Sequence, residues 1–134
     1  MLNRIAFFLA VLGLLTAPAL AQGVAFSTAS NGGFGSCFGS EVVEASACAQ
    51  ENCASVTGLS VSECTVSLWC SPHSWFAALS ITPVDGEPYF DFLCNEPNLE
   101  KVEEVIAVTC NYEGYASCEI FQVWDPSGVA QYEQ

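Results

Sequence analysis

His73 is the only histidine in the chain, and it lies between Ser71 and Ser74 at the end of the stretch ECTVSLWCSPH, residues 63–73. A serine hydrolase needs a histidine to take the proton of a nucleophilic serine, with an acid behind it. The sequence has no Gly-x-Ser-x-Gly motif for a strained nucleophile turn, and a histidine directly after a proline at a strand end is typical of a loop. We therefore expect no catalytic role for His73, and a small hydrolase using it is kept as the alternative.

Glu100 and Glu104 are the clearest carboxylate pair, because they lie at positions i and i+4 of a predicted helix. A glycosidase would need two carboxylates facing each other across a cleft, which residues on one helix face do not provide. Four glutamates around Lys101 are instead the usual pattern of a solvated helix face. A hydrolase using such a pair is the second form of the alternative, and we expect no enzyme.

Asp85, Glu87 and Asp91 flank one predicted hairpin and are the best candidates for a calcium site. The sequence contains no Asp-x-Asp-x-Asp-Gly loop to gather such ligands. Zinc would need closely spaced thiolates with histidines, and the chain has one histidine. We therefore expect neither a metal nor a cofactor.

The chain has eight cysteines, an even number without a Cys-x-x-Cys motif. This pattern favours structural disulfides, formed in an oxidising compartment, over a reactive thiol. The eight positions are Cys37, Cys48, Cys53, Cys64, Cys70, Cys94, Cys110 and Cys118.

Residues 1–21 have the pattern of a secretory signal peptide. Arg4 precedes an apolar run over residues 5–15, and Ala19-Leu20-Ala21 is a small-x-small cleavage site. We expect cleavage after Ala21 and export to the periplasm or the medium. The apolar run is shorter than the roughly 20 residues of a membrane span, so an uncleaved anchor is the less favoured alternative.

The remaining chain is strongly acidic, since Lys101 is its only base against 15 acidic residues. Such a chain repels nucleic acid and anionic lipid and attracts cations or a basic protein. The acids are scattered among apolar residues, which argues against a disordered acidic tail. Solubility alone is the simpler explanation of this charge.

An internal repeat organises the chain. A shift of 57 residues places Cys37 on Cys94 and Cys53 on Cys110, with apolar residues at spacings of three and four between them. This spacing predicts one amphipathic helix in each copy, over about 41–53 and 97–110. Ser40 is the expected N-cap of the first helix. Asn95 or Asn98 is expected to cap the second, with Pro97 in its first turn.

Strand patterns surround both helices. With three residues deleted from the second loop, ECTVSLWCSPH aligns with SCEIFQVWDPS, and hairpin patterns precede each helix at VAFS-TASNGG-FGSCFG and FAALSIT-PVDGEP-YFDFLC. We therefore predict one α+β domain over residues 22–127, built from two strand-strand-helix-strand repeats, 22–74 and 75–127. Six strands would form one mostly antiparallel sheet or two related sheets, with two helices covering a face. Residues 128–134 show no periodicity and are expected to form a loose tail.

The repeat also constrains the disulfides. Each copy has a cysteine that ends its helix and another that starts the next strand, which predicts the pairs Cys53–Cys64 and Cys110–Cys118. Each bridge would stabilise the fold by roughly 2–3 kcal/mol. Of the remaining four, Cys48 is placed to reach Cys37. Cys70 and Cys94 would then join the two copies.

At this point the chain resembles a family of secreted bacterial proteins that carry a domain of unknown function. The resemblance rests on FGSCFGSEVVEASACAQENC, ECTVSLW, FAALSI, YFDFLC, LEKVEEVIAVTC and SCEIFQVW, and covers most of residues 24–124. It implies two repeats of an aromatic and glycine-rich hairpin, a helix ending in cysteine, and a strand opening with cysteine. It implies no catalytic residue.

Strand alternation in YFDFLC places Phe90 and Phe92 on one face and Tyr89 and Asp91 on the other. We expect the second face, together with Tyr112 and Tyr115 of a nearby loop, to form a contact surface. A sheet covered on both faces is the alternative.

The sequence therefore predicts an exported, disulfide-stabilised binding domain of the bacterial cell envelope. The expected partner is a basic protein, for example a cationic hydrolase that it inhibits, or another envelope component. A passive structural protein of the envelope is a further alternative.

Overall fold

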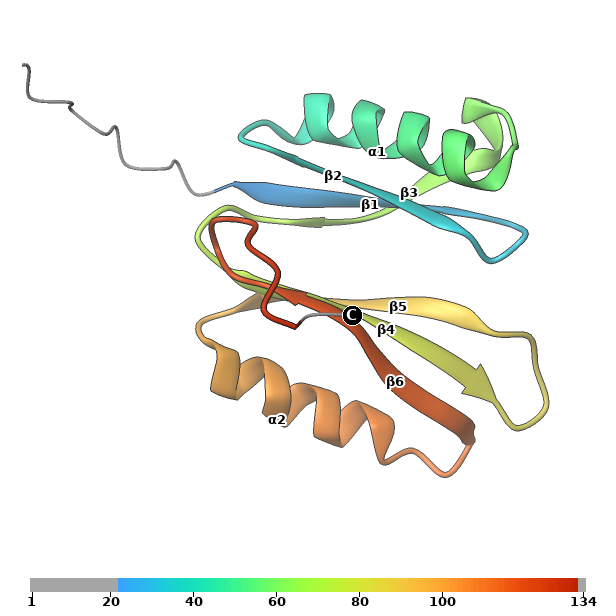
Figure 1. Cartoon of the computed structure of the whole chain (residues 1–134), viewed down its shortest axis with the longest axis vertical. Helices are drawn as coiled ribbons and strands as arrows, with labels where there is room; N and C mark the ends of the chain where they lie inside the picture. The colour runs from blue at the N-terminus through green and yellow to red at the C-terminus, as the bar shows by residue number, and fades with distance from the viewer. Residues whose placement is uncertain (1–21, 133–134) are drawn as a thin grey trace, which may run out of the picture.

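A computed structural model describes residues 22–132 (Figure 1). Both halves follow the order strand, strand, helix, strand, and a short 3-10 helix, η1, precedes the last strand of the first half. The elements are β1 (Gly23–Ala29), β2 (Phe34–Gly39), α1 (Val42–Thr57), η1 (Val61–Glu63), β3 (Cys64–Cys70), β4 (Trp75–Pro83), β5 (Tyr89–Glu96), α2 (Leu99–Cys110) and β6 (Tyr115–Trp124). The expected α+β class is confirmed.

The strands form two separate antiparallel sheets of three. The first sheet has the order β2-β1-β3 and the second the order β5-β4-β6, so the leading strand of each half is central. In the first sheet Val24 pairs with Phe38 on one side and Cys70 on the other. Of the two arrangements that the sequence left open, the structure has the one with two related sheets.

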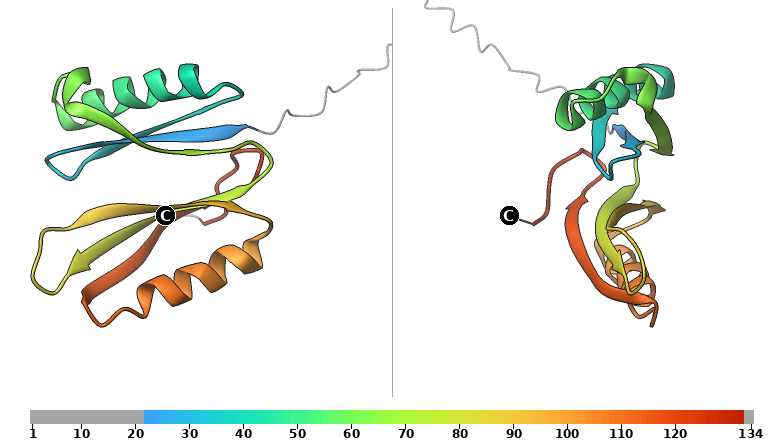
Figure 2. Two further views of the ribbon diagram at one scale, coloured as in Figure 1. Left: turned by 180° about the vertical axis from the view of Figure 1, so that it is seen from behind. Right: turned by 90° about the vertical axis from the view of Figure 1, so that its right-hand side faces the viewer.

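The sheets stack face to face, and each helix covers the outer face of its own sheet (Figures 1 and 2). The two helices therefore lie on opposite sides of the molecule. An aromatic layer fills the space between the sheets, where the ring of Phe26 stacks on that of Phe92 with centroids 4.2 Å apart. The rings in contact within this layer are Phe26, Phe34, Phe38, Phe76, Phe90, Phe92, Phe121 and Trp124.

In β1, strand alternation sends the large side chains of Val24 and Phe26 inward and the small side chain of Ala25 toward α1. Ala45 and Ala49 of α1 are buried against Ala25 of β1. A Cβ atom on Gly35 would lie 2.1 Å from the backbone nitrogen of Cys53, so only glycine lets α1 approach β2 this closely. α2 buries the larger residues Val102 and Ile106 instead.

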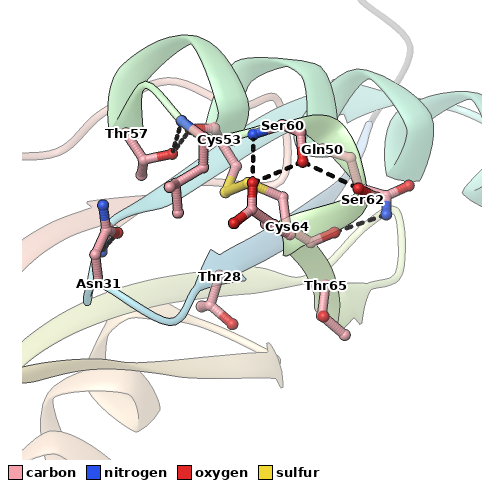
Figure 3. The surroundings of a disulfide bond; sticks show 12 residues. Thr28, Asn31, Gln50, Cys53, Thr57, Ser60, Ser62, Cys64 and Thr65 are labelled. Atoms are coloured by element: carbon pink, nitrogen blue, oxygen red, sulfur yellow. Dashed lines mark hydrogen bonds between the residues drawn. A yellow bond between two sulfur atoms is a disulfide. The ribbon is translucent and has the colours of Figure 1, made fainter.

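Four disulfides hold this frame: Cys37–Cys48, Cys53–Cys64, Cys70–Cys94 and Cys110–Cys118. They are the four pairs expected from the sequence, and two of them close the connection between a helix and the following strand. Cys70–Cys94 joins the two halves. Figure 3 shows Cys53–Cys64, where the Gln50 amide donates a hydrogen bond to the Cys64 carbonyl at 2.8 Å. Four disulfides are typical of proteins that fold outside the cytoplasm.

The helix boundaries differ from the expected ones in three details. α1 continues to Thr57 and ends where Gly58 adopts the left-handed conformation, with φ of 72°. Its N-cap is Glu41 rather than Ser40, without a side-chain capping bond. In α2 the cap is Asn98, whose side chain accepts a hydrogen bond from the Lys101 backbone, and Pro97 precedes the helix instead of lying in its first turn.

The described part of the expected loose tail, residues 128–132, is ordered against the sheet, and residues 133–134 lie outside the described part of the chain. Residues 128–132 turn back on β6, and Ala130 forms an isolated bridge with Trp124. The Gln122 side chain donates a hydrogen bond to the Tyr132 carbonyl at 2.9 Å. Because the buried Gln122 amide needs partners, it attaches a segment that has no periodic apolar pattern.

The expected signal peptide, residues 1–21, lies outside the described part of the chain. Within residues 22–132, neither helix is both long and apolar enough to cross a membrane.

Candidate functional site

His73 is exposed in the turn between β3 and β4 and has a positive φ of 67°. The neighbouring hydroxyls have other partners: Ser71 donates to the Asn95 side chain and Ser74 donates to the Ser71 carbonyl, both at 2.7 Å. No described serine or carboxylate hydrogen-bonds to the His73 side chain. The geometry thus provides no assembled triad.

The carboxylates of residues 22–132 do not form the candidate reactive pair or a metal site. Glu104 forms an ion pair with Lys101 on the exposed face of α2, and Glu100 lies on the same solvated surface. Among residues 22–132, no three His, Cys, Asp or Glu side chains come together as metal ligands.

Three tyrosines meet at one end of the second half. The hydroxyl of Tyr89, the first residue of β5, donates to the hydroxyl of Tyr115, the first residue of β6, at 3.3 Å. The ring of Tyr112, from the loop after α2, packs edge-on against Tyr115 with centroids 5.0 Å apart. We refer to Tyr89, Tyr112 and Tyr115 as the tyrosine cluster.

Backbone contacts fix the cluster in place. The Val84 amide of the β4–β5 turn donates to the Gly114 carbonyl of the α2–β6 loop at 2.9 Å, which holds these two loops together. A Cβ atom on Gly114 would lie 2.2 Å from the ring of Tyr112. Glycine at this position therefore lets the Tyr112 ring lie against the chain and beside Tyr115.

The residues around the cluster are acidic, and the Tyr89 hydroxyl at its centre is uncharged. The hydrogen bond to Tyr115, then burial and the charge of Asp91, raise the pKa of Tyr89 to about 12, so this phenol stays neutral near pH 7. Asp85 and Glu113 are exposed in the two loops. The base Lys101 lies in the first turn of α2, whereas the cluster lies beyond its last turn.

A groove opens between the two sheets next to the cluster. Its larger hollow, of about 700 Å³, lies between the β1–β2 turn, residues 29–32, and residues 87–90 at the start of β5, with Ser80 also lining it. A smaller hollow of about 350 Å³ adjoins it and is lined by Thr28, Ser67, Leu68, Phe90, Asp91 and Phe92. We refer to both hollows, which share Phe90, as the inter-sheet groove.

The structure brings together three of the four residues expected in the contact surface. Asp91 lies two positions after Tyr89 and contributes to its raised pKa, but it hydrogen-bonds to the Phe92 backbone and lines the groove instead. Leu93, on the same strand face, packs against the buried core around α2. The middle of β5 is therefore covered on both faces, as the alternative expected, and only its first residue, Tyr89, belongs to the exposed surface.

Sequence reasoning missed the groove. Its walls come from β1, β3 and β5, and their juxtaposition depends on how the two sheets stack. The turn pattern at residues 29–32 predicted a hairpin, but nothing in it indicated that this hairpin would face the start of β5.

No family model, curated protein or solved structure matches the chain, so its function is inferred from its own residues.

Proposed function

We propose that the protein is an exported binding domain of the bacterial cell envelope that holds a basic protein through the tyrosine cluster. The signal-like residues 1–21, the four disulfides and the resemblance to secreted bacterial proteins support the compartment. Inhibition of a cationic hydrolase would be one form of this binding.

One observation carries the proposal: exposed tyrosines lie beside acidic loops, and the one lysine or arginine of residues 22–132, Lys101, lies at the other end of α2. Tyr112 keeps 64% of its surface exposed and Tyr89 keeps 39%. Tyrosine rings provide contact area with little loss of conformational entropy, and their faces attract lysine and arginine. Asp85 and Glu113 supply carboxylates for the same cations.

The disulfides serve this function by fixing the surface before it binds. Cys110–Cys118 closes the chain around the loop that carries Tyr112 and Glu113. A loop held in its bound conformation loses less entropy on association, so a small surface can bind more tightly.

The experiment is capture from an envelope extract by immobilised protein that begins at Gln22. We expect basic proteins to bind and to be released at about 0.5 M NaCl, where screening shortens electrostatic range to about 4 Å. The variant Tyr112→Ala with Glu113→Lys should lose them. The matched control, Val56→Ala with Glu51→Lys on α1, makes the same change in charge on a distant exposed surface and should retain them.

Recovery of no basic protein, or equal recovery by both variants, would contradict the proposal. The first of these results would favour a passive structural role.

A further inference from the structure

The last described residues return along the chain and pair with the outer edge of β6. The Gln131 amide donates to the Val123 carbonyl at 2.9 Å. Beside this bond, Ala130 forms a bridge with Trp124. β6 lies at the edge of its sheet, and no other strand of the described residues pairs with this side of it. We refer to residues 130–132 as the C-terminal strap.

The Gln122 side chain binds the backbone of the C-terminal strap. Gln122 is buried, with only 8% of its surface exposed. Its amide nitrogen donates to the Tyr132 carbonyl at 2.9 Å, and its amide oxygen accepts the Tyr132 backbone amide at 3.3 Å. Two residues of an antiparallel strand pair exchange the same two bonds. The Gln122 amide is therefore a buried group that binds the main chain of an added strand, whatever side chain that strand carries.

A carboxylate on α2 binds the one side chain that the C-terminal strap directs toward this helix. The Tyr132 hydroxyl donates to Glu103 at 2.9 Å. Glu103 is exposed, and no lysine or arginine of residues 22–132 forms an ion pair with it, because Lys101 is paired with Glu104. A lysine or arginine in the place of Tyr132 would add the attraction of opposite charges to this hydrogen bond.

The C-terminal strap is held by few forces besides hydrogen bonds. Residues 129–132 are all exposed, so their pairing buries little apolar surface. The net contribution of such hydrogen bonds is modest, and the cost of ordering the segment opposes it. Segments of this kind open locally while the rest of the domain stays folded. Opening leaves the Gln122 amide, the Val123 carbonyl and the Glu103 carboxylate open to another chain.

We propose that the β6 edge at Gln122 is a binding site for an extended segment of a partner protein, and that the C-terminal strap occupies it until such a segment displaces the strap. The segment pairs with β6 as an added strand and carries a lysine or arginine that binds Glu103. This charge gives it the advantage over the chain's own Tyr132. The inference goes beyond the proposed function, because the site shares no residue with the tyrosine cluster.

The test uses the oxidised protein from Gln22 to Gln134 with Gln131→Pro, which removes the amide that bonds to Val123 and opens the C-terminal strap. The probes are three capped hexapeptides: residues 129–134, the same peptide with Tyr132→Lys, and the lysine peptide with Gln131→Pro as well. The backbone amide chemical shifts of Val123 and Trp124 report opening and binding. The lysine peptide should bind more tightly than the tyrosine peptide, and the proline peptide should shift neither amide. The unmodified protein should bind the lysine peptide roughly tenfold or more weakly, because its own strap must open first.

Glu103→Gln in the opened protein should weaken binding of the lysine peptide roughly fivefold, as the loss of a charged partner predicts. The matched control, Glu44→Gln, removes the same charge from the exposed face of α1 and should change the affinity less than about twofold.

Three results would overturn the inference: amides of Val123 and Trp124 that Gln131→Pro leaves unchanged, no shift from any peptide, or equal binding of the lysine and proline peptides. The cluster variant, Tyr112→Ala with Glu113→Lys, should leave the affinity of the opened protein for the lysine peptide within about twofold. This binding and capture from the extract therefore succeed or fail separately.

Discussion

The hydroxyls of Tyr89 and Tyr115 lie 3.3 Å apart and join the two edge strands of the second sheet. Their partners on the central strand β4 are Ile81 and Pro83, so the hydrogen bond passes over the end of that strand. This contact positions the tyrosine cluster, because Tyr112 packs on the Tyr115 ring. The surface proposed to bind a partner is therefore attached to the core of the sheet.

Replacing Tyr115 with phenylalanine should lower the pKa of Tyr89 from about 12 toward its ordinary value of 10. The cause is loss of the acceptor that stabilises the neutral Tyr89 phenol. Phenolate absorbance measured against pH would show one tyrosine titrating earlier. Tyr112→Phe is the control, since Tyr112 contacts Tyr115 through its ring and its hydroxyl makes no hydrogen bond to the described residues. An unchanged titration curve in Tyr115→Phe would be inconsistent with this hydrogen bond.

The same shift predicts a loss of stability at alkaline pH. The folded-state pKa of Tyr89 is raised, so its contribution is present below pH 10 and disappears as the pH rises toward about 12. Urea unfolding midpoints measured across this range should fall less steeply in Tyr115→Phe than in the unmodified protein. Parallel curves for the two proteins would contradict the prediction.

Glu63 should make the turn before β3 sensitive to acid. The Ser60 hydroxyl and backbone amide both donate to the Glu63 carboxylate, at 2.7 and 2.9 Å, and hold its pKa below the ordinary 4.5. The contribution is thus present above pH 4.5 and is lost as the pH falls through the lower folded-state value. The protection of the amides of residues 60–64 against hydrogen exchange, taken relative to the intrinsic exchange rate at each pH, should fall in acid, and Glu63→Gln should remove this dependence. Glu51→Gln, on the exposed face of α1, should leave it intact.

Gly35→Ala should reduce the free energy of unfolding by about 2–3 kcal/mol, because the added methyl group meets the α1 backbone at Cys53 and Ala49. Urea unfolding measures this loss. Gly58→Ala is the matched control: its Cβ meets nothing within 4 Å, and only the left-handed φ of 72° is unfavourable. We expect a loss of about 1 kcal/mol there. Equal losses at the two positions would argue against close packing of α1 on β2.

Replacing Cys110 and Cys118 together with serine should reduce the free energy of unfolding by about 3 kcal/mol, from the greater entropy of the unfolded chain. The double variant at Cys53 and Cys64 should lose a similar amount, since the sequence separations are 8 and 11 residues. Peptide mapping without reduction should recover both linked pairs from the unmodified protein. Recovery of other pairings would contradict the framework.

The cysteine and apolar spacing that the two halves of the sequence share allowed much of the fold to be predicted. Cys53 lies on the buried face of α1, and Cys110 ends α2. Cys64 opens β3, and Cys118 lies within β6. The short separation along the chain favours the pairs Cys53–Cys64 and Cys110–Cys118. The expected end of α1 at Cys53 precedes its observed end at Thr57, because Cys53 aligns with Cys110, which does end α2. The stop is instead at Gly58, a residue that can adopt the left-handed conformation after a helix.

Features that depend on tertiary packing could not be predicted in the same way. Asp91 alternates with Phe90 and Phe92 along β5, but its place beside Ser67 depends on the stacking of the two sheets. The return of residues 128–132 depends on the buried Gln122 amide and on backbone contacts with the end of β6, such as the hydrogen bond from the Gln131 amide to the Val123 carbonyl. The tyrosine cluster was partly predictable. Tyr89 and Tyr115 are the first residues of β5 and β6, the two strands that flank the central strand β4.

Site-specific photocrosslinking in bacterial cells that produce the full chain tests most directly whether the tyrosine cluster binds a partner. A photoreactive phenylalanine analogue replaces Tyr112 in the cluster, or Val56 on the exposed face of α1 as the control. Mass spectrometry then identifies the attached proteins. If the tyrosine cluster binds a basic protein, that protein is crosslinked from position 112 and not from position 56. No adduct at position 112, or the same adducts from both positions, would contradict it.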